Sequence, residues 1–392
     1  MTGQTTVGII ANPASARDVR RLVAQGGAVT THDKLNRLHR VLTGLAATGV
    51  GRVISMSDRG GITAGLRRAA NRRAGDAWPV VEFVEQSITH TAADTAVATR
   101  AMVELGVGAI VVLGGDGTNR VVARESSDVP LVSISTGTNN TFPTPMEPTI
   151  AGLAAGLVAS NAASRAAGTY RAKTMEIRCG DRLENALVDV AITQAEVVGS
   201  GAVWDAASLS ELFLCFAEPD AIGLSAIGGQ LRPVRRRQPA GLHLRLGMPA
   251  TTVLRPPIGP GLLAPVGVRS IGELGLHAPV TAEASEGVVA IDGERMFRFG
   301  RDDRPTITLR ADGPVVVDAT ATLDHAARHG LLATTSTDAR TGTRSRTLDP
   351  TTREPNTNQK GQHRDTNEST RALHRDGPHP AVRIAHLAGV PR

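Results

Sequence analysis

The residues of this chain best suited to chemistry form a glycine-rich turn around one acid, Gly114-Gly115-Asp116-Gly117-Thr118. The apolar run before it, residues 109–113, is too short for a helix and rich in β-branched residues, so it predicts a strand buried on both faces of a parallel sheet. Glycines let the backbone turn sharply and bring its N–H groups close to an anionic ligand. Ligands of open α/β sheets bind at the carboxyl ends of the strands, so the turn predicts a phosphate-binding loop. The simpler alternative is a strand-to-helix turn in which Asp116 caps the next helix.

Two further loops follow predicted strands. Residues 130–134 are a short apolar run that opens into hydroxyls and amides, Ser135-Thr136-Gly137-Thr138-Asn139-Asn140-Thr141. Neutral donors of this kind suit phosphate and ribose groups. The glycine-rich turn and this second loop follow consecutive strands about twenty residues apart, so a doubly wound sheet would place them side by side. Asn12-Pro13, after a strand at residues 7–10, is a third candidate. The alternative is that this Asn-Pro pair forms an ordinary turn without a binding role.

These motifs resemble the superfamily of ATP-dependent kinases that holds NAD kinases, diacylglycerol kinases and sphingosine kinases. The resemblance rests on the Gly-Gly-Asp-Gly-Thr turn, the Asn-Pro before it and the Thr-Gly-Thr-Asn-Asn turn after it. It covers residues 5–330 and is strongest toward the NAD-kinase-like branch that includes the acetoin catabolism protein X. The segments that resemble this branch are residues 197–205, 222–229 and 290–295.

The resemblance implies an ATP-dependent small-molecule kinase, NAD kinase-like, that uses ATP and Mg2+ to phosphorylate a hydroxyl of NAD or a related acceptor. It makes Asp116 the catalytic residue, either as a base toward the acceptor hydroxyl or as a residue that places the metal. The nucleotide-binding residues that it implies are Asn12, Gly114, Gly115, Gly117, Thr118, Thr136, Gly137 and Thr138. The substrate-binding residues that it implies are Asn139, Asn140, Asp189, Ser225, Gly228, Gly229, Asp292, Gly293 and Glu294. For the Asp-Gly-Glu segment, an ordinary hairpin turn is the alternative.

Two departures from the NAD kinase pattern bear on the acceptor. Val188 stands where those enzymes carry Asn before an acid, so that only the acid, Asp189, is kept. Their Gly-Ser-Thr-Ala-Tyr element is also replaced, by residues 220–224. Both changes remove hydrogen bonds or stacking from a bound dinucleotide. Another small alcohol or a lipid is therefore an alternative acceptor, and a nucleotide-binding sensor without turnover is the alternative from another class.

The source of positive charge at the phosphates is open. The chain has only three lysines, and no Walker-type Gly-Lys-Ser/Thr follows any glycine. Charge neutralisation must then come from arginine, a metal ion or backbone dipoles. One candidate cluster is Arg232, Arg235, Arg236 and Arg237, for which a solvated charged surface is the alternative.

Strand and helix patterns alternate in the first part of the chain. Strands are predicted at residues 7–10, 52–56, 80–84, 109–113 and 131–134, and helices at 34–47, 62–73 and 92–105. This rhythm predicts the fold class α/β, with an N-terminal doubly wound parallel-sheet (Rossmann-like) nucleotide-binding domain at residues 1–146.

A helix to about residue 159 then leads into a β-rich C-terminal substrate domain, residues 147–330. Its strands are predicted at residues 173–178, 186–193, 241–246, 287–291 and 306–310. The resemblance implies that the end of this domain, residues 314–332, returns to complete the first domain.

Charge and composition narrow the function classes. Residues 331–392 carry ten basic and six acidic groups, whereas the other 330 residues carry 33 and 31. Near-neutral charge and 2% aromatic residues argue against nucleic acid as a partner. The tail at residues 331–392 has too few apolar residues to offset its ordering entropy, so we predict disorder, with a basic arm that contacts RNA or acidic partners as the alternative.

Cysteine use and hydropathy indicate the compartment. The chain has two cysteines, no charged-then-apolar leader and no apolar run long enough to cross a bilayer. We therefore expect a cytoplasmic protein without a membrane partner or a zinc site, acting on a small-molecule substrate as a homo-oligomer.

Overall fold

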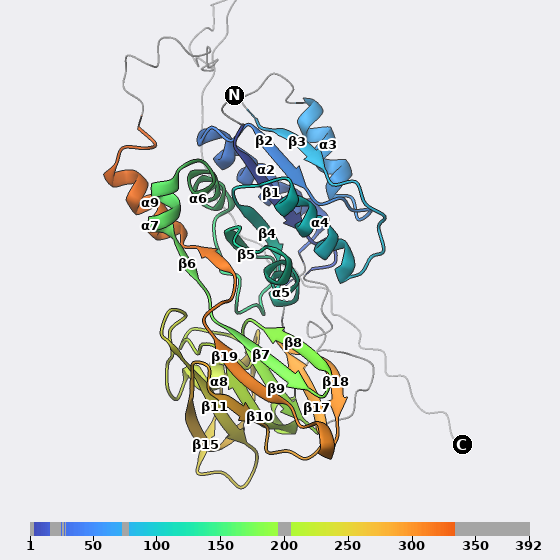
Figure 1. Cartoon of the computed structure of the whole chain (residues 1–392), viewed down its shortest axis with the longest axis vertical. Helices are drawn as coiled ribbons and strands as arrows, with labels where there is room; N and C mark the ends of the chain where they lie inside the picture. Colours follow the sequence, from blue (N-terminus) through green and yellow to red (C-terminus); the bar gives the residue numbers. More distant parts are fainter. Residues whose placement is uncertain are drawn as a thin grey trace, which may run out of the picture. The chain divides into compact units, whose positions relative to one another are not determined.

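The structure is a computed structural model that describes residues 4–15, 25, 27, 29–72, 78–194 and 205–333, with the side chain of Arg295 excepted (Figure 1). The described residues all lie within one compact unit, Met1–Ala333. The tail beyond residue 333, for which disorder is predicted, lies outside the described residues. The same holds for residues 197–204 of the segment 197–205.

A parallel sheet forms the first half of this unit. Its strands pair in the order β3-β2-β1-β4-β5, so the direction of winding reverses between β1 and β4. Every residue of β4 is buried, as predicted for a strand covered on both faces. The strands are β1 (Thr6–Ala11), β2 (Arg52–Ser55), β3 (Val80–Phe83), β4 (Ile110–Gly114) and β5 (Leu131–Ser135).

Helices cover both faces of this sheet. Ile9 of β1 packs in the apolar cluster of α2 and α6, whereas the next residue, Ile10, packs in the cluster of α4 and α5, because successive strand residues point to opposite faces. A Cβ atom on Gly44 would lie 2.3 Å from the carbonyl oxygen of Thr149, so α2 and α6 are in backbone contact. The helices are α2 (Thr31–Ala47), α3 (Ile62–Arg72), α4 (Ala92–Glu104), α5 (Asp116–Glu125) and α6 (Pro148–Ser160).

The second half is rich in antiparallel strands. A seven-stranded sheet in the order β12-β15-β11-β10-β9-β17-β18 packs on a four-stranded sheet, β16-β19-β7-β8, through a shared apolar core. The central strands are β7 (Thr174–Cys179), β8 (Arg182–Ala186), β9 (Asp189–Thr193), β10 (Leu209–Leu214), β11 (Ala240–Leu246), β17 (Gly287–Ile291), β18 (Glu294–Phe299) and β19 (Thr306–Arg310). The others are β12 (Thr252–Leu254), β13 (Pro257–Gly259), β14 (Leu262–Leu263), β15 (Val266–Gly275) and β16 (Pro279–Thr281), with a short helix α8 (Ser225–Gly229) after β10.

The end of the described chain returns to the first sheet. β20 (Val315–Val317) pairs in parallel with β5 and antiparallel with β6 (Thr169–Arg171), and α9 (Ala319–Arg328) packs on α6 and α7 (Ala162–Gly168). The predicted fold class and the implied return are therefore confirmed. One strand was expected over residues 186–193, but the chain turns at Leu187 and Val188, so that β8 and β9 are separate strands.

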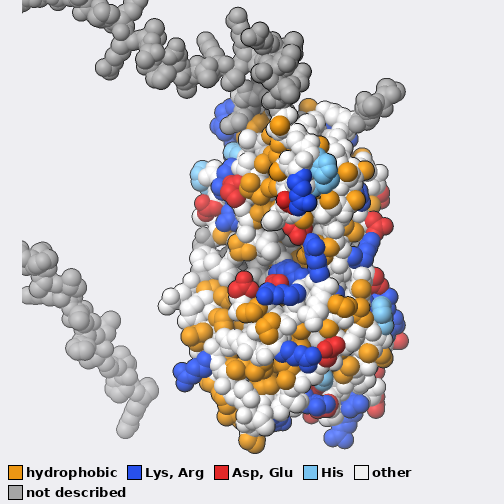
Figure 2. All heavy atoms as spheres, turned by 90° about the vertical axis from the view of Figure 1, so that its left-hand side faces the viewer, with side chains coloured by type: hydrophobic (Ala, Val, Ile, Leu, Met, Phe, Trp, Pro, Cys, Tyr) orange, Lys and Arg blue, Asp and Glu red, His pale blue; other side chains and the backbone are white. Residues whose placement is uncertain are grey.

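Within the part of the chain that the structure describes, no helix has both the length and the apolar character to cross a membrane. On the face shown in Figure 2, basic and acidic side chains are interspersed, in keeping with the nearly balanced charge of residues 1–330.

Candidate functional site

Asp116 lies in the first turn of α5, at the carboxyl end of β4. Gly115 is the N-cap residue of this helix, so Asp116 does not take the capping position. The Asp116 carboxylate instead accepts hydrogen bonds from the backbone N–H of Thr141, at 3.0 and 3.1 Å, and of Phe142, at 2.8 Å. The glycine-rich turn and the second loop therefore lie side by side, as predicted, and the carboxylate fixes the distance between them.

The third loop, after β1, joins the other two. Asn12 Nδ2 donates to Thr118 Oγ1 of α5 at 3.0 Å, and Thr136 Oγ1 donates to Ser15 Oγ at 3.1 Å. Asn12 thus contacts a residue of the glycine-rich turn, and Ser15 contacts one of the second loop. The loops that follow β1, β4 and β5 meet at the switch point of the sheet, which is where ligands bind in folds of this kind.

Glycine at two positions of the turn is required by this packing. A Cβ atom on Gly114 would lie 2.6 Å from Thr118 Cβ, and one on Gly115 would lie 2.7 Å from the side-chain oxygen of Asn140. Contacts this short require atoms to shift, so a larger residue at Gly114 would displace Thr118 of the same turn, and one at Gly115 would displace Asn140 of the second loop. A Cβ atom on Gly117 would lie 3.7 Å from a Glu294 carboxylate oxygen, which is an ordinary van der Waals contact, so this position does not require glycine on grounds of space.

Lys34 is a residue of this site that the sequence motifs do not reveal. It is 1% exposed on α2, and its Nζ donates to the carbonyl oxygens of Asn12, Pro13 and Ser15 at 3.0, 2.9 and 2.8 Å. The ammonium group therefore holds the loop after β1 in a closed turn. Only the scarcity of lysine could have indicated Lys34 from the sequence. The chain has three lysines, and Lys34 is the one that binds a candidate loop.

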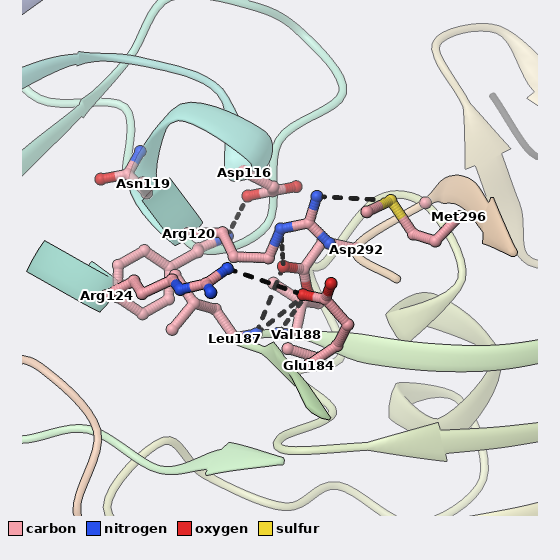
Figure 3. A network of polar contacts seen from close by, with 12 residues as sticks. Asp116, Asn119, Arg120, Arg124, Glu184, Leu187, Val188, Asp292 and Met296 are labelled. Carbon is pink, nitrogen blue, oxygen red and sulfur yellow. Dashed lines mark hydrogen bonds and ion pairs between the residues drawn. The ribbon is translucent and has the colours of Figure 1, made fainter. Parts of the chain in front are cut away.

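The Asp-Gly-Glu segment joins β17 to β18 and faces α5 (Figure 3). Asp292 and Gly293 have φ of 49° and 77°, so the hairpin alternative is observed: they form a tight turn with two left-handed residues. The Gly293 N–H donates to Asp189 Oδ1 at 3.2 Å, and the Glu294 carboxylate approaches Gly117. The hairpin thus also brings Glu294 to the glycine-rich turn and Asp292 to Arg120 of α5, and it binds the third predicted acid, Asp189, through Gly293.

Asp292 is completely buried and organises the turn between β8 and β9. Its Oδ1 accepts hydrogen bonds from the N–H of Leu187, Val188 and Asp189 at 3.0, 2.8 and 3.3 Å. These bonds explain why residues 186–193 do not form one strand. Burial raises the pKa of Asp292 to about 7, although Arg120 acts in the opposite direction.

The predicted residues of α8 take no part in these contacts. Ser225 is buried and donates to the carbonyl of Phe216 at 2.9 Å. A Cβ atom on Gly228 would lie 2.5 Å from Leu214 Cδ1, and one on Gly229 would lie 2.2 Å from a backbone carbonyl oxygen. The small residues of α8 therefore serve close packing on β10. Of the second loop, Thr138 is exposed, and Gly137 and Asn139 are half-buried.

Three of the four arginines of the cluster form ion pairs, and Arg235 is exposed. Arg232 pairs with Glu273 and Arg237 with Asp318. Arg236 is the member that contacts the site, through the carbonyl oxygens of Thr141 and Phe142 and the carboxylate of Glu218. Asp116 therefore holds the N–H groups of these two loop residues, and Arg236 holds their carbonyl oxygens.

Comparison with known proteins agrees with this architecture. The ATP-NAD kinase N-terminal domain family matches residues 7–162, and the acetoin catabolism protein X C-terminal domain family matches residues 173–312. The acetoin catabolism protein X of Cupriavidus necator is 42% identical over 335 residues, which cover 83% of this chain and 93% of that protein. A solved structure of a putative diacylglycerol kinase from Bacillus anthracis str. Sterne is 13% identical, with a TM-score of 0.42 over 81% of this chain and 98% of that chain.

The match to the Cupriavidus necator protein covers 83% of this chain, so it cannot be confined to either half of the described residues. The identity and coverage are those of a homologue with the same domain arrangement. The chain therefore belongs to the acetoin catabolism protein X family, with an N-terminal domain of the ATP-NAD kinase type.

Proposed function

We propose that this chain is an ATP-dependent kinase that phosphorylates a hydroxyl of NAD or of a related small acceptor. The observation that carries the proposal is the meeting of three loops around Asp116 at the switch point of the parallel sheet. The match of an ATP-NAD kinase domain to residues 7–162 supports ATP as the phosphoryl donor.

In this proposal the glycine-rich turn binds the phosphates through backbone N–H groups at the start of α5. Phosphoryl transfer requires positioning and charge neutralisation more than covalent chemistry, so the rigidity of the loops matters. Asp116 lies where an acceptor hydroxyl would meet the phosphate, held by two backbone N–H groups of the second loop. Hydrogen bonds of this kind fix the direction in which the carboxylate points.

Magnesium fits the residues present. Mg2+ is usually bound by one or two carboxylates together with substrate phosphates rather than by a complete protein cage. Among the described residues no group of three or more His, Cys, Asp or Glu side chains is arranged to hold a metal. Asp116, and Glu294 beside Gly117, are the carboxylates that would hold the ion with the nucleotide, and its charge would then be supplied to the phosphates.

A nucleotide-binding sensor is the second candidate. Val188, at the place where NAD kinases carry Asn, is completely buried, and its N–H is bonded to Asp292. The site therefore lacks a side-chain amide for a dinucleotide at this position. This loss favours either a different acceptor or binding without turnover.

The test is a screen for transfer. Purified protein with ATP and Mg2+ is incubated with NAD, NADH or small polyols, and the phosphorylated product and ADP are measured by mass spectrometry. We expect acceptor-dependent formation of one product, and weak affinity if the acceptor is NAD. Tight ATP binding without transfer to any acceptor would support the sensor instead, and absence of ATP binding would contradict both functions.

A further inference from the structure

Arg120 carries a guanidinium group with too few acceptors. It lies on α5 one turn after Asp116, pointing toward the β17–β18 hairpin, and its side chain is 15% exposed (Figure 3). Its Nε is 3.8 Å from Asp292 Oδ2, beyond hydrogen-bond distance, and its Nη2 donates to Met296 Sδ at 3.6 Å. The third nitrogen, Nη1, is buried and has no hydrogen-bond partner.

This pattern differs from that of the other arginine at the site. Arg236 directs Nε, Nη1 and Nη2 at three separate oxygen atoms. Arg120 has one distant carboxylate and one thioether, which is a weak acceptor. Among the described residues, Arg120 is also the only arginine with a buried guanidinium nitrogen that lacks a partner. A buried charged donor without an acceptor is unfavourable, and a group that brings oxygen atoms would supply the acceptor that Arg120 lacks.

The chemistry of the missing group follows from the guanidinium. Its planar fork matches two oxygen atoms of a phosphate or carboxylate. Gly117 lies between Asp116 and Arg120 on the same turn of α5, and the nearest atoms to a Cβ atom there would be those of the Glu294 carboxylate, at 3.7 Å or more. Because the Glu294 carboxylate lies beside Gly117, a bare anion would be repelled there, whereas a phosphoryl group accompanied by a divalent cation would not.

We propose that Arg120 binds a phosphoryl group at the junction between α5 and the β17–β18 hairpin. The choice of phosphate rests on the proposed function, and two molecules could supply it: the terminal phosphate of the nucleotide or a phosphate of the acceptor. Arg120 would then be the arginine that neutralises charge in a site without a Walker lysine.

The experiment measures binding, so that it does not depend on turnover. Affinities of MgATP, MgADP and NAD are determined by calorimetry for the wild type, Arg120→Gln and Arg120→Lys. Arg124→Gln is the matched control, because Arg124 lies one turn further on α5, is 64% exposed and is 3.8 Å from Glu184. Melting temperatures verify that each variant is folded, and Arg120→Lys, which keeps the charge toward Asp292, carries the test if Arg120→Gln does not fold.

If Arg120 binds the terminal phosphate, Arg120→Gln lowers the affinity for MgATP roughly tenfold or more and leaves the affinity for MgADP nearly unchanged. If it binds a phosphate of the acceptor, NAD affinity falls by a similar factor and the ratio of MgATP to MgADP affinity stays constant. Arg120→Lys should recover only part of the loss, because it keeps the charge without the fork. Affinities of Arg120→Gln equal to those of Arg124→Gln for all three molecules, or no binding of any by the wild type, would overturn the proposal.

Discussion

Replacement of Asp292 by Asn should change how the stability of the protein depends on pH. Asp292 has an ordinary pKa of 3.8 that burial raises to about 7 in the folded protein. Arg120 lowers this pKa and Asp116 raises it, and the other titratable groups close by are Asp189 and Cys215. Between the two pKa values the folded chain binds a proton that the unfolded chain has released.

The sign follows from this difference in proton binding. Because the folded-state pKa of this acid is raised, the stability of the wild type is greatest at low pH and falls as the pH rises through 7, and the loss is complete about one pH unit above that value. Each pKa unit corresponds to about 1.4 kcal/mol, so the loss between about pH 5 and pH 7 is on the order of 3 kcal/mol. Asp292→Asn keeps an oxygen for the three N–H groups of residues 187–189 but does not titrate.

The assay is urea unfolding of wild type and Asp292→Asn from about pH 5 to about pH 8. The free energy of unfolding of the wild type minus that of the variant should fall by on the order of 3 kcal/mol between about pH 5 and about pH 8, and its slope should vanish once the pH has passed the folded-state pKa of about 7. Asp94→Asn is the control, because hydrogen bonds from Thr89 and His90 lower the pKa of Asp94 despite its burial. The free energy of unfolding of the wild type minus that of Asp94→Asn should therefore not vary between about pH 5 and about pH 8. If the difference in free energy of unfolding between the wild type and Asp292→Asn is also constant over this range, the raised pKa of Asp292 is refuted.

Three other variants test the loops and the tail. Arg236→Gln should accelerate amide hydrogen exchange at Thr141 and Phe142 and lower the free energy of unfolding by about 1.5 to 3 kcal/mol, because charge-assisted hydrogen bonds to two carbonyl oxygens are lost. Unchanged exchange would show that Asp116 alone holds the loop. Lys34→Met should destabilise the protein by about 3 kcal/mol, measured by urea unfolding, since three loop carbonyls lose their donor; a loss below about 1 kcal/mol would contradict this role. Truncation after Ala333 should leave the melting temperature within a few degrees of the wild type, because the apolar clusters of the described chain lie before it, and a larger drop would contradict an independent tail.

The parallel sheet could be predicted because its signals are local. Short apolar runs with β-branched residues, separated by helical patterns, gave the strands β1 to β5 to within about one residue at each end. β8 and β10 escaped prediction for opposite reasons. β8 is mostly polar and exposed, and β10 is almost wholly buried, so neither shows the alternation typical of a half-buried strand.

The candidate site could be predicted only in part. Motifs indicated Asp116 and the three loops, because glycine, hydroxyl and amide residues cluster beside the strand ends. The contacts of Lys34, Arg120 and Arg236 join segments up to 176 residues apart, and no local pattern reports such pairs. The turn at residues 187–188 likewise depends on Asp292, which is 104 residues further along the chain than Val188.

The claim that Asp116 is the reactive centre of a kinase is tested most directly by single-turnover phosphoryl transfer from ATP. Asp116→Asn removes the charge but keeps the size and one oxygen for the N–H groups of Thr141 and Phe142. Arg236→Gln is the control, because it loosens the same loop from the carbonyl side and leaves Asp116 intact. The account predicts that transfer falls by about two to four orders of magnitude in Asp116→Asn, much more than in Arg236→Gln, while ATP affinity weakens less than transfer. Transfer by Asp116→Asn at the rate of the wild type would contradict the account.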